Sequence, residues 1–177
     1  MPIKRTAYPH SNDYAREHDE LPAYRESNKI NRECAAAIDK AISDSNYEPF
    51  HYDLKSAMQK VTAEYGQKRV AWVLAAVVQD AADYDVRYSP QNREWARSFP
   101  IPVEQRYGNP RPRLPYYGTN AHPTLVDSFI NYLRIQMMQK KERKTSVTGA
   151  LKDGAKQIAA AKPAHEQNKT KKSEQEI

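Results

Sequence analysis

The stretch RVAWVLAAVVQD, residues 69–80, decides the fold of this 177-residue chain. Its nine residues from Val70 to Val78 carry no polar side-chain atom except the indole N–H of Trp72, although 28% of the whole chain is charged. A helix needs about 20 apolar residues to cross a bilayer, and a helix that is apolar all round for two turns is buried on most sides. The stretch therefore predicts the central helix of a helical bundle and no membrane partner.

The residues just before this stretch predict its packing partner. Asp53 is a good N-cap for a helix whose apolar face is formed by Leu54, Ala57, Met58, Val61 and Tyr65. Gly66 can take the left-handed conformation that ends a helix, since glycine has no Cβ. The two helices then form an αα-hairpin over residues 54–82. A DNA-binding helix-turn-helix is disfavoured, because its second helix must present polar side chains to the major groove.

Further helices are predicted around this hairpin. A long amphipathic helix over residues 22–44 has an apolar face that repeats every three or four residues. That face consists of Tyr24, Ser27, Ile30, Cys34, Ile38, Ala41 and Ile42. A short helix begins at Asn12 or Asp13 and ends near His18. Another runs over 90–98 behind the start signal Ser89–Pro90 and places Trp95 on the core.

The last predicted helix covers residues 123–141 and begins at His122–Pro123. Between 100 and 123 lie six prolines and two glycines, which predict an irregular connection. The fold class is therefore all-α: a small helical bundle built round a central αα-hairpin, with a Pro-rich irregular connection. We predict a flexible arm over 1–12, a single helical domain over 13–141 and a mostly disordered basic tail over 142–177, with a marginal helix near 147–161.

The net charge of +6 belongs largely to the end of the chain. Residues 140–177 hold ten basic and five acidic side chains, while the other residues hold 18 basic and 17 acidic ones. A duplex-binding protein normally carries its basic residues on the folded part. The distribution therefore weakens a nucleic-acid interpretation of the body, while the Lys-rich tail could still add salt-sensitive affinity for nucleic acid.

The motifs of known chemistry are missing from the sequence. It has no GxxxxGK, GxGxxG, HExxH, CxxC or GxSxG pattern, and its histidines lack a ligand-like spacing. Cys34 is the single cysteine and lies on a predicted apolar face, which favours packing over a nucleophilic role. We therefore predict no catalytic residues, no metal and no cofactor. With no secretory signal at its N-terminus, the chain is expected in the cytoplasm.

One acidic cluster keeps two interpretations open. Asp80, Asp83 and Asp85 follow the central helix near Arg87, and His122 precedes the last helix. Carboxylates gathered there could bind a cation or act as an acid/base pair with the histidine. They could equally pair with arginines and cap neighbouring turns, because a carboxylate at a helix C-terminus needs a partner.

The part of the Pro-rich connection between 106 and 117 holds the strongest candidates for contact with a partner. Arginine beside tyrosine is typical of protein interface anchors and also of surfaces that stack on unpaired bases; packing on its own domain is the third interpretation. With 12 tyrosines against 3 phenylalanines, the chain favours surfaces that are apolar on one side and wet on the other. The predicted partner-binding residues are Arg106, Tyr107, Arg111, Arg113, Tyr116 and Tyr117, with Tyr88 and Asn92 from the exposed part of 84–95.

Four segments resemble, in the same order, an uncharacterised domain family common in prophages and conjugative elements of gut Firmicutes. They are YAREHDELPAYRESNKINRECAAAI, YGQKRVAWVLAAVVQ, YDVRYSPQNREWA and HPTLVDSFINYLR, and the resemblance spans Tyr14 to Arg134. It implies an accessory module of a mobile element and transfers no catalytic residue. The expectation is a non-enzymatic protein that binds another protein, such as an inhibitor of a host defence effector like a CRISPR nuclease. The alternative is a nucleic-acid-binding accessory factor that uses the Arg/Tyr connection and the Lys-rich tail.

Overall fold

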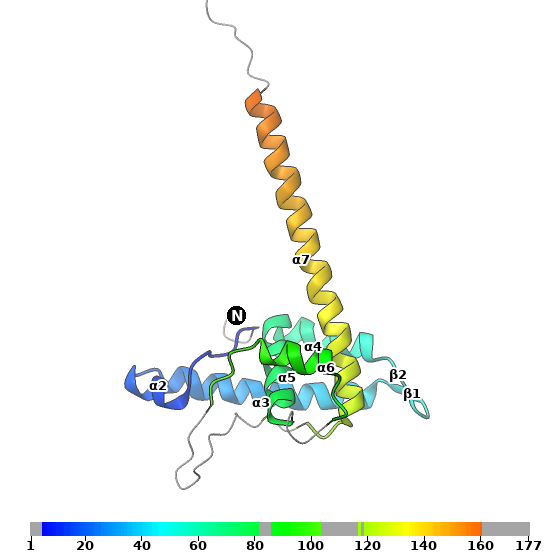
Figure 1. Cartoon of the computed structure of the whole chain (residues 1–177). Helices are drawn as coiled ribbons and strands as arrows, with labels where there is room; N and C mark the ends of the chain where they lie inside the picture. The colour runs from blue at the N-terminus through cyan, green and yellow to red at the C-terminus, as the bar shows by residue number, and fades with distance from the viewer. Residues whose placement is uncertain (1–4, 82–85, 104–116, 118, 161–177) are drawn as a thin grey trace, which may run out of the picture. The chain divides into compact units, whose positions relative to one another are not determined.

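The protein is an all-α bundle with one small β-hairpin (Figure 1). The computed structural model describes residues 5–81, 86–103, 117 and 119–160, and of 143–160 it describes the backbone alone. The helices are α2 (Asn12–Glu17), α3 (Leu21–Asp44), α4 (Leu54–Tyr65), α5 (Gln67–Ala81), α6 (Pro90–Arg97) and α7 (Pro123–Ala160). Strands β1 (Asn46–Glu48) and β2 (His51–Tyr52) lie between α3 and α4. The predicted all-α class is confirmed.

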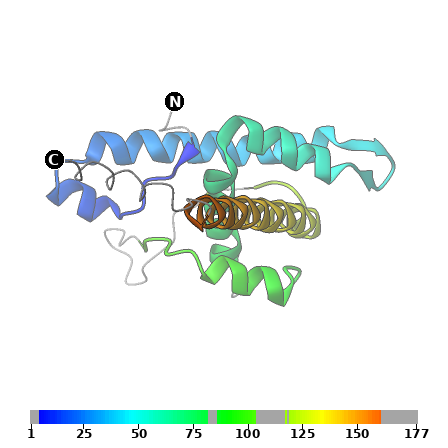
Figure 2. The same ribbon diagram turned by 90° about the horizontal axis from the view of Figure 1, so that it is seen from above.

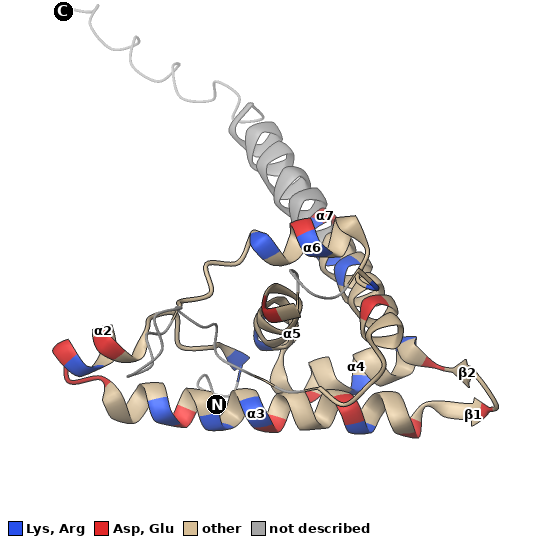
Figure 3. Ribbon diagram, turned by 60° about the horizontal axis from the view of Figure 1, so that its bottom comes forward, with Lys and Arg blue, Asp and Glu red and all other residues tan. Residues whose placement is uncertain are grey.

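Helix α5 is the centre of the bundle, as its sequence predicts. Seven of its apolar residues have no exposed surface: Val70, Ala71, Val73, Leu74, Ala75, Ala76 and Val78. Figure 3 looks nearly along α5 and shows α3 and α6 on different sides of it. Trp72 is partly buried against the same cluster. Surrounding elements therefore cover the apolar run on most sides.

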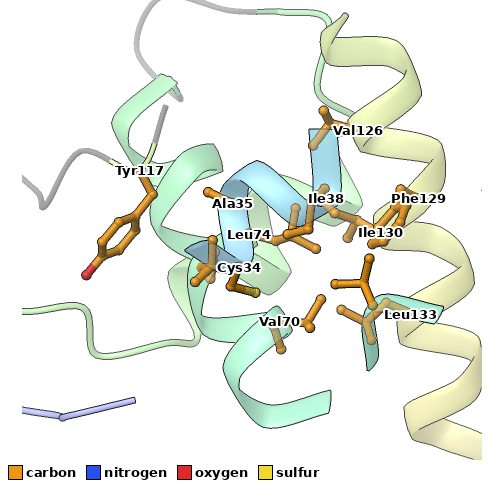
Figure 4. Packing of buried hydrophobic residues seen from close by; sticks show 14 of the residues in the cluster. Cys34, Ala35, Ile38, Val70, Leu74, Tyr117, Val126, Phe129, Ile130 and Leu133 are labelled. Carbon is orange, nitrogen blue, oxygen red and sulfur yellow. The ribbon is translucent and has the colours of Figure 1, made fainter. Parts of the chain in front are cut away.

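The first turns of α7 complete this core. Val126, Phe129, Ile130 and Leu133 have no exposed surface. They recur three and four residues apart, so one face of the helix carries all of them. Figure 4 shows Phe129 and Ile130 beside Ile38 of α3. The predicted apolar face of the last helix is thus the face that closes the bundle.

Most of the predicted helix ends have the expected caps. The Asp53 side chain accepts a hydrogen bond from the backbone N–H of Ser56 at 3.1 Å, and Ser89 caps α6 with Pro90 in its first turn. The cap of α2 is Ser11 rather than Asn12 or Asp13, because the Ser11 hydroxyl accepts from the Tyr14 N–H at 3.2 Å. Capping geometry therefore places the first helix within one residue of the prediction.

Gly66 separates α4 from α5 but differs in detail from the prediction. Its φ is 79°, as a terminating glycine requires, whereas its ψ of 146° is extended rather than left-handed helical. The helix still ends there, because the Gly66 N–H donates to the Thr62 carbonyl and the chain then turns directly into α5. A Cβ on this residue would meet the Arg5 side chain at 3.1 Å.

Two segments hold more regular structure than expected. Residues 46–52 form a β-hairpin where the sequence indicates only the end of a helix. Helix α7 continues to Ala160, beyond the predicted end at residue 141, and residues 138–177 form a compact unit separate from 1–137. No proline interrupts 124–160, and alanine, lysine and glutamine there favour a helix.

The described part of the N-terminal arm is attached to the bundle. The Tyr8 N–H donates to the Ser27 hydroxyl at 2.8 Å, and the Tyr8 ring packs edge-on against Tyr24 with centroids 5.9 Å apart. A continuous row of rings then leads from Tyr8 through His10 to Tyr14. The arm predicted to be flexible therefore has defined contacts from Thr6 onward.

Among the described residues, no helix is long and apolar enough to span a bilayer.

Candidate functional site

The predicted partner-binding residues fall into two groups in the structure. Arg106, Tyr107, Arg111, Arg113 and Tyr116 lie outside the described residues. Tyr88, Asn92 and Tyr117 are described, and all three are buried. Their side chains contact the bundle itself, so the described part of the site is best read as the support of residues 104–116, which we call the Arg/Tyr segment.

Tyr117 holds the C-terminal end of the Arg/Tyr segment on helix α3. Its hydroxyl accepts a hydrogen bond from the Asn31 amide nitrogen at 2.8 Å and donates to Asn28 Oδ1 at 2.7 Å. The side chain is 5% exposed. A buried tyrosine generally needs a partner for its hydroxyl, and here two amides from adjacent turns of one helix fill that role.

The hydrogen-bond chain at Tyr117 continues inward to Arg69. Asn31 Oδ1 accepts from the Arg69 guanidinium, which also donates to the Ser27 carbonyl at 3.0 Å and to the Thr6 carbonyl. Arg69 has no exposed surface, and burial lowers the pKa of its guanidinium from the usual value. Because each group donates to the next, the chain of bonds ties α5, α3, the N-terminal segment and Tyr117 into one network.

A second contact fastens the residues that follow Tyr117. The carboxylate of Asp39 on α3 accepts from the backbone N–H of Asn120 at 2.7 Å and from that of Ala121 at 3.2 Å. At the other end of the segment, Ile101 is 7% exposed and belongs to the core cluster. Both ends of the Arg/Tyr segment are therefore attached to the same helical body.

Asn92 belongs to a polar cluster that joins α6 to α7. Its amide nitrogen donates to Asp127 Oδ1 at 2.8 Å and to Asn131 Oδ1 at 3.0 Å, while its oxygen accepts from Arg134 at 2.7 Å. The Ser89 hydroxyl also donates to Asp127, at 3.1 Å. Asn92 has no exposed surface, so its amide positions two helices.

Tyr88 lines a pocket of about 450 Å³ together with Asp80, Tyr117 and His122. Of the residues considered for acid/base chemistry, Asp83 and Asp85 lie outside the described residues and Arg87 is exposed. The Nδ1 atom of His122 lies 2.8 Å from the Thr124 hydroxyl and 3.4 Å from the Thr124 backbone nitrogen. This is the geometry of a helix cap, so the capping interpretation of His122 has direct support.

Cys34 is positioned as a core residue. It has no exposed surface, and burial raises the pKa of its thiol to about 12. The reactive thiolate is therefore scarce at neutral pH. Within the described ranges, no cluster of three or more His, Cys, Asp or Glu side chains could hold a metal ion.

Sequence reasoning missed Arg69, the largest fully buried side chain of the site. The quoted stretch places it directly before nine apolar residues, one turn ahead of Val73 on the same helix. A charged residue that borders such a run, with Ser27 and Asn31 on the apolar face of another helix, indicates a buried polar network. That signal was present in the sequence, although the pairing of the two helices was needed to join its parts.

No curated protein and no solved structure matches this chain. A family model described as a protein of unknown function, DUF3849, matches residues 7–139. This match covers α2 to the first half of α7 and thus includes the whole bundle around α5. The chain belongs to the DUF3849 family.

Proposed function

We propose that the protein is a non-enzymatic binding module that contacts a protein partner through the Arg/Tyr segment. The observation that supports this most is the attachment of both ends of the segment to one helical body, through Ile101 and Tyr117. Loops held by a rigid scaffold are the usual carriers of binding function. Arginine and tyrosine are also the residues most enriched among interface hot spots.

The buried polar groups around the segment have structural roles that favour binding over catalysis. Tyr117, Asn92 and Arg69 each donate to or accept from groups of the same chain. Fixing the ends of a binding segment before association reduces the entropy lost on binding. The hydrogen bonds of Tyr117 to Asn28 and Asn31 support a segment whose C-terminal end is fixed before binding.

The proposed setting is the cytoplasm of a bacterium that carries a phage or another mobile element. The support is the resemblance of four ordered segments to a family found in such elements. We propose a host defence effector, such as a CRISPR nuclease, as the partner class. Co-expression with a defence system that restricts a test phage should raise plaque formation by orders of magnitude. Unchanged restriction by every system tried would remove this assignment while leaving the binding proposal intact.

The binding proposal is tested by changing the segment without touching its supports. Alanine at Tyr107, Arg111, Arg113 and Tyr116 together should abolish capture of a partner from the bacterial host and leave the helical circular dichroism unchanged. A matched control replaces Arg25, Arg97 and Tyr132, which are exposed elsewhere on the body, and should bind normally. Purified partner then gives the dissociation constant of each variant. Equal affinity of the wild type and the fourfold variant would refute the proposal.

Nucleic acid is the competing ligand, and ionic strength separates it from a protein. In Figure 3 the ribbon of α3 carries basic and acidic residue positions interspersed along its length. A nucleic-acid complex formed by the Arg/Tyr segment and the Lys-rich tail should weaken by orders of magnitude between low and moderate salt. Gel retardation of single and double strands at two salt concentrations measures this. Tight, steeply salt-dependent retardation that the fourfold variant loses would replace the protein partner with nucleic acid.

A further inference from the structure

The β-hairpin exposes two large aromatic side chains that folding of one chain does not explain. Tyr47 is 66% exposed and Phe50 is 92% exposed. Phe50 also has a φ of 67°, in the left-handed region that favours glycine. A bulky residue held there costs on the order of 1–3 kcal/mol. Phe50 therefore bears a backbone cost and a solvation cost without a packing gain within its own chain.

The strands of the hairpin have open edges. Asn46 pairs with Tyr52 and Glu48 with His51, and in the described part of the chain β1 and β2 form a two-stranded sheet by themselves. Figure 2 shows this hairpin at the end of α3 and α4, away from α2. An uncovered strand edge offers backbone donors and acceptors to another strand.

A pocket of about 710 Å³ lies at the base of the hairpin. Its lining includes Ala41 and Ser45 from the end of α3, Tyr47 and Tyr52 from the strands, and Ser56 and Ala57 from α4. Aromatic rings and small side chains leave room for an aromatic ring from outside. The tip of the hairpin and this pocket are thus a projection and a recess at opposite ends of the same short element.

The charges at the pocket balance. Asp44, Asp53 and Lys60 line it, and Lys40 lies beside it as the ion-pair partner of Asp44. The Asp44 carboxylate accepts from Lys40 Nζ at 2.8 Å, and this hydrogen bond lowers its pKa. Two identical copies of such a face can approach without the like-charge repulsion that a single-sign patch would create.

We propose that two copies of this chain associate through their hairpins in an antiparallel, two-fold arrangement. Each Phe50 enters the pocket at the base of the other hairpin, and the open strand edges lie side by side. Strands of three residues span about 10 Å, so an antiparallel crossing brings tip to base in both directions at once. A two-fold interface requires the same patch on both partners to be self-complementary, and a projection beside a matching recess satisfies that requirement.

The size of the hairpin predicts a weak, concentration-dependent dimer. A stable interface buries about 800 Å² on each partner, and we expect strands of three and two residues with one pocket to bury less. We therefore expect a dissociation constant in the micromolar range or above. The proposal concerns a different surface from the Arg/Tyr segment and does not depend on the proposed function.

Sedimentation of the full chain between about 10 µM and 1 mM tests the proposal. The wild type should shift from monomer to dimer as concentration rises. Phe50→Gly removes the tip side chain and suits the positive φ, so it should fold normally and weaken the dimer at least tenfold. Val86→Ser, which changes an apolar side chain that is 87% exposed elsewhere, should dimerise like the wild type. A monomer at every concentration, or an unchanged dimer in Phe50→Gly, would overturn the proposal.

A mixing experiment tests the reciprocal contact itself. Ser56→Trp should fill the pocket and weaken self-association, while its Phe50 remains intact. Mixed with Phe50→Gly, it can still place its tip into the open pocket of the other variant. The mixed dimer should therefore be tighter than the dimer of either variant alone, as measured by energy transfer between labelled chains. A mixture no tighter than both separate variants would exclude reciprocal insertion.

Discussion

Helix α5 and the hairpin 46–52 differ in how their side chains are used. In α5, Val70, Val73 and Leu74 have no exposed surface, and the adjacent Arg69 is surrounded by acceptors. In the hairpin, Phe50 is almost fully exposed on a backbone that favours glycine. Helix α4 connects the two regions. The same chain therefore contains a centre whose side chains are buried and hydrogen-bonded and a tip whose aromatic ring is exposed to solvent.

This difference separates residues that folding explains from residues that it leaves unexplained. In α5, burial and hydrogen bonds within the chain offset the conformational entropy that is lost on folding. In the isolated molecule the Phe50 ring makes almost no stabilising contact with its own chain. An exposed and strained aromatic residue of this kind points to an interaction with another molecule. The contrast can be tested by changing each region and measuring stability.

The largest loss of stability is expected from Arg69→Met. Methionine keeps most of the side-chain volume but leaves the Ser27 carbonyl, Asn31 Oδ1 and the Thr6 carbonyl without this donor. Hydrogen bonds to a charged group contribute about 1.5–3 kcal/mol each, and the carbonyl of the exposed Thr6 can bond to water instead, so we expect a loss of roughly 4 kcal/mol in urea unfolding. Lys68→Met, at the exposed neighbouring position, should change stability by less than about 0.5 kcal/mol. Equal effects would mean that the network contributes little.

A smaller loss is expected from Leu74→Ala at the middle of α5. The side chain has no exposed surface and lies in the cluster with Ile38 and Ile130. Truncation removes buried methyl groups and leaves a cavity, which costs about 3 kcal/mol. Thermal and urea unfolding of the variant measure this value. A loss below about 1 kcal/mol would show that the bundle collapses readily around α5 and is not closely packed there.

The bundle could be predicted from the sequence because its signals are local and mutually consistent. The apolar run of α5, the Asp53 cap and the Ser89–Pro90 start each determine structure within one turn of the chain. Gly66 illustrates the limit: the need for positive φ follows from its position between two helices, whereas neither its extended ψ nor the nearness of Arg5 to the place of a Cβ can be read from the sequence. Local chemistry thus predicts the elements, and tertiary contacts adjust them.

The candidate site was less accessible to sequence reasoning, for a physical reason. Tyr117 lies 86 residues from Asn31, and Asp39 holds the backbone of Asn120 across a similar separation. Such pairs depend on the packing of helices, which no pattern in a single sequence specifies. Polar residues such as Asn92 were therefore expected on the surface, although buried partners satisfy them. The hairpin was missed because its turn places Phe50 where glycine is the usual signal.

A moderate, pH-dependent loss of stability should come from Cys34. Burial raises the pKa of its thiol from 9.0 to about 12. Above about pH 9 the unfolded chain loses this proton while the folded chain keeps it, so stability falls by about 1.4 kcal/mol per pH unit. The free energy of unfolding in urea should fall more steeply between about pH 9 and 10 in the wild type than in Cys34→Ala, in which Tyr8 and Tyr65, whose pKa values are also raised to about 12, still contribute. Identical slopes in both proteins would show that the thiol ionises freely.

The smallest effects should come from the two turn positions with positive φ, and they should have opposite signs. Gly66→Ala places a Cβ 3.1 Å from the Arg5 side chain on a backbone with φ of 79°, so we expect a loss of about 1–2 kcal/mol. Phe50→Gly removes an exposed ring from a backbone with φ of 67° and should raise stability by about 0.5–1 kcal/mol. Thermal unfolding at low protein concentration, where the monomer prevails, measures the stability of both variants.

Higher stability of Phe50→Gly together with lost self-association would mean that Phe50 is retained for contact between chains although it destabilises the fold. A loss of stability in Phe50→Gly would instead show that the hairpin needs this side chain within its own chain.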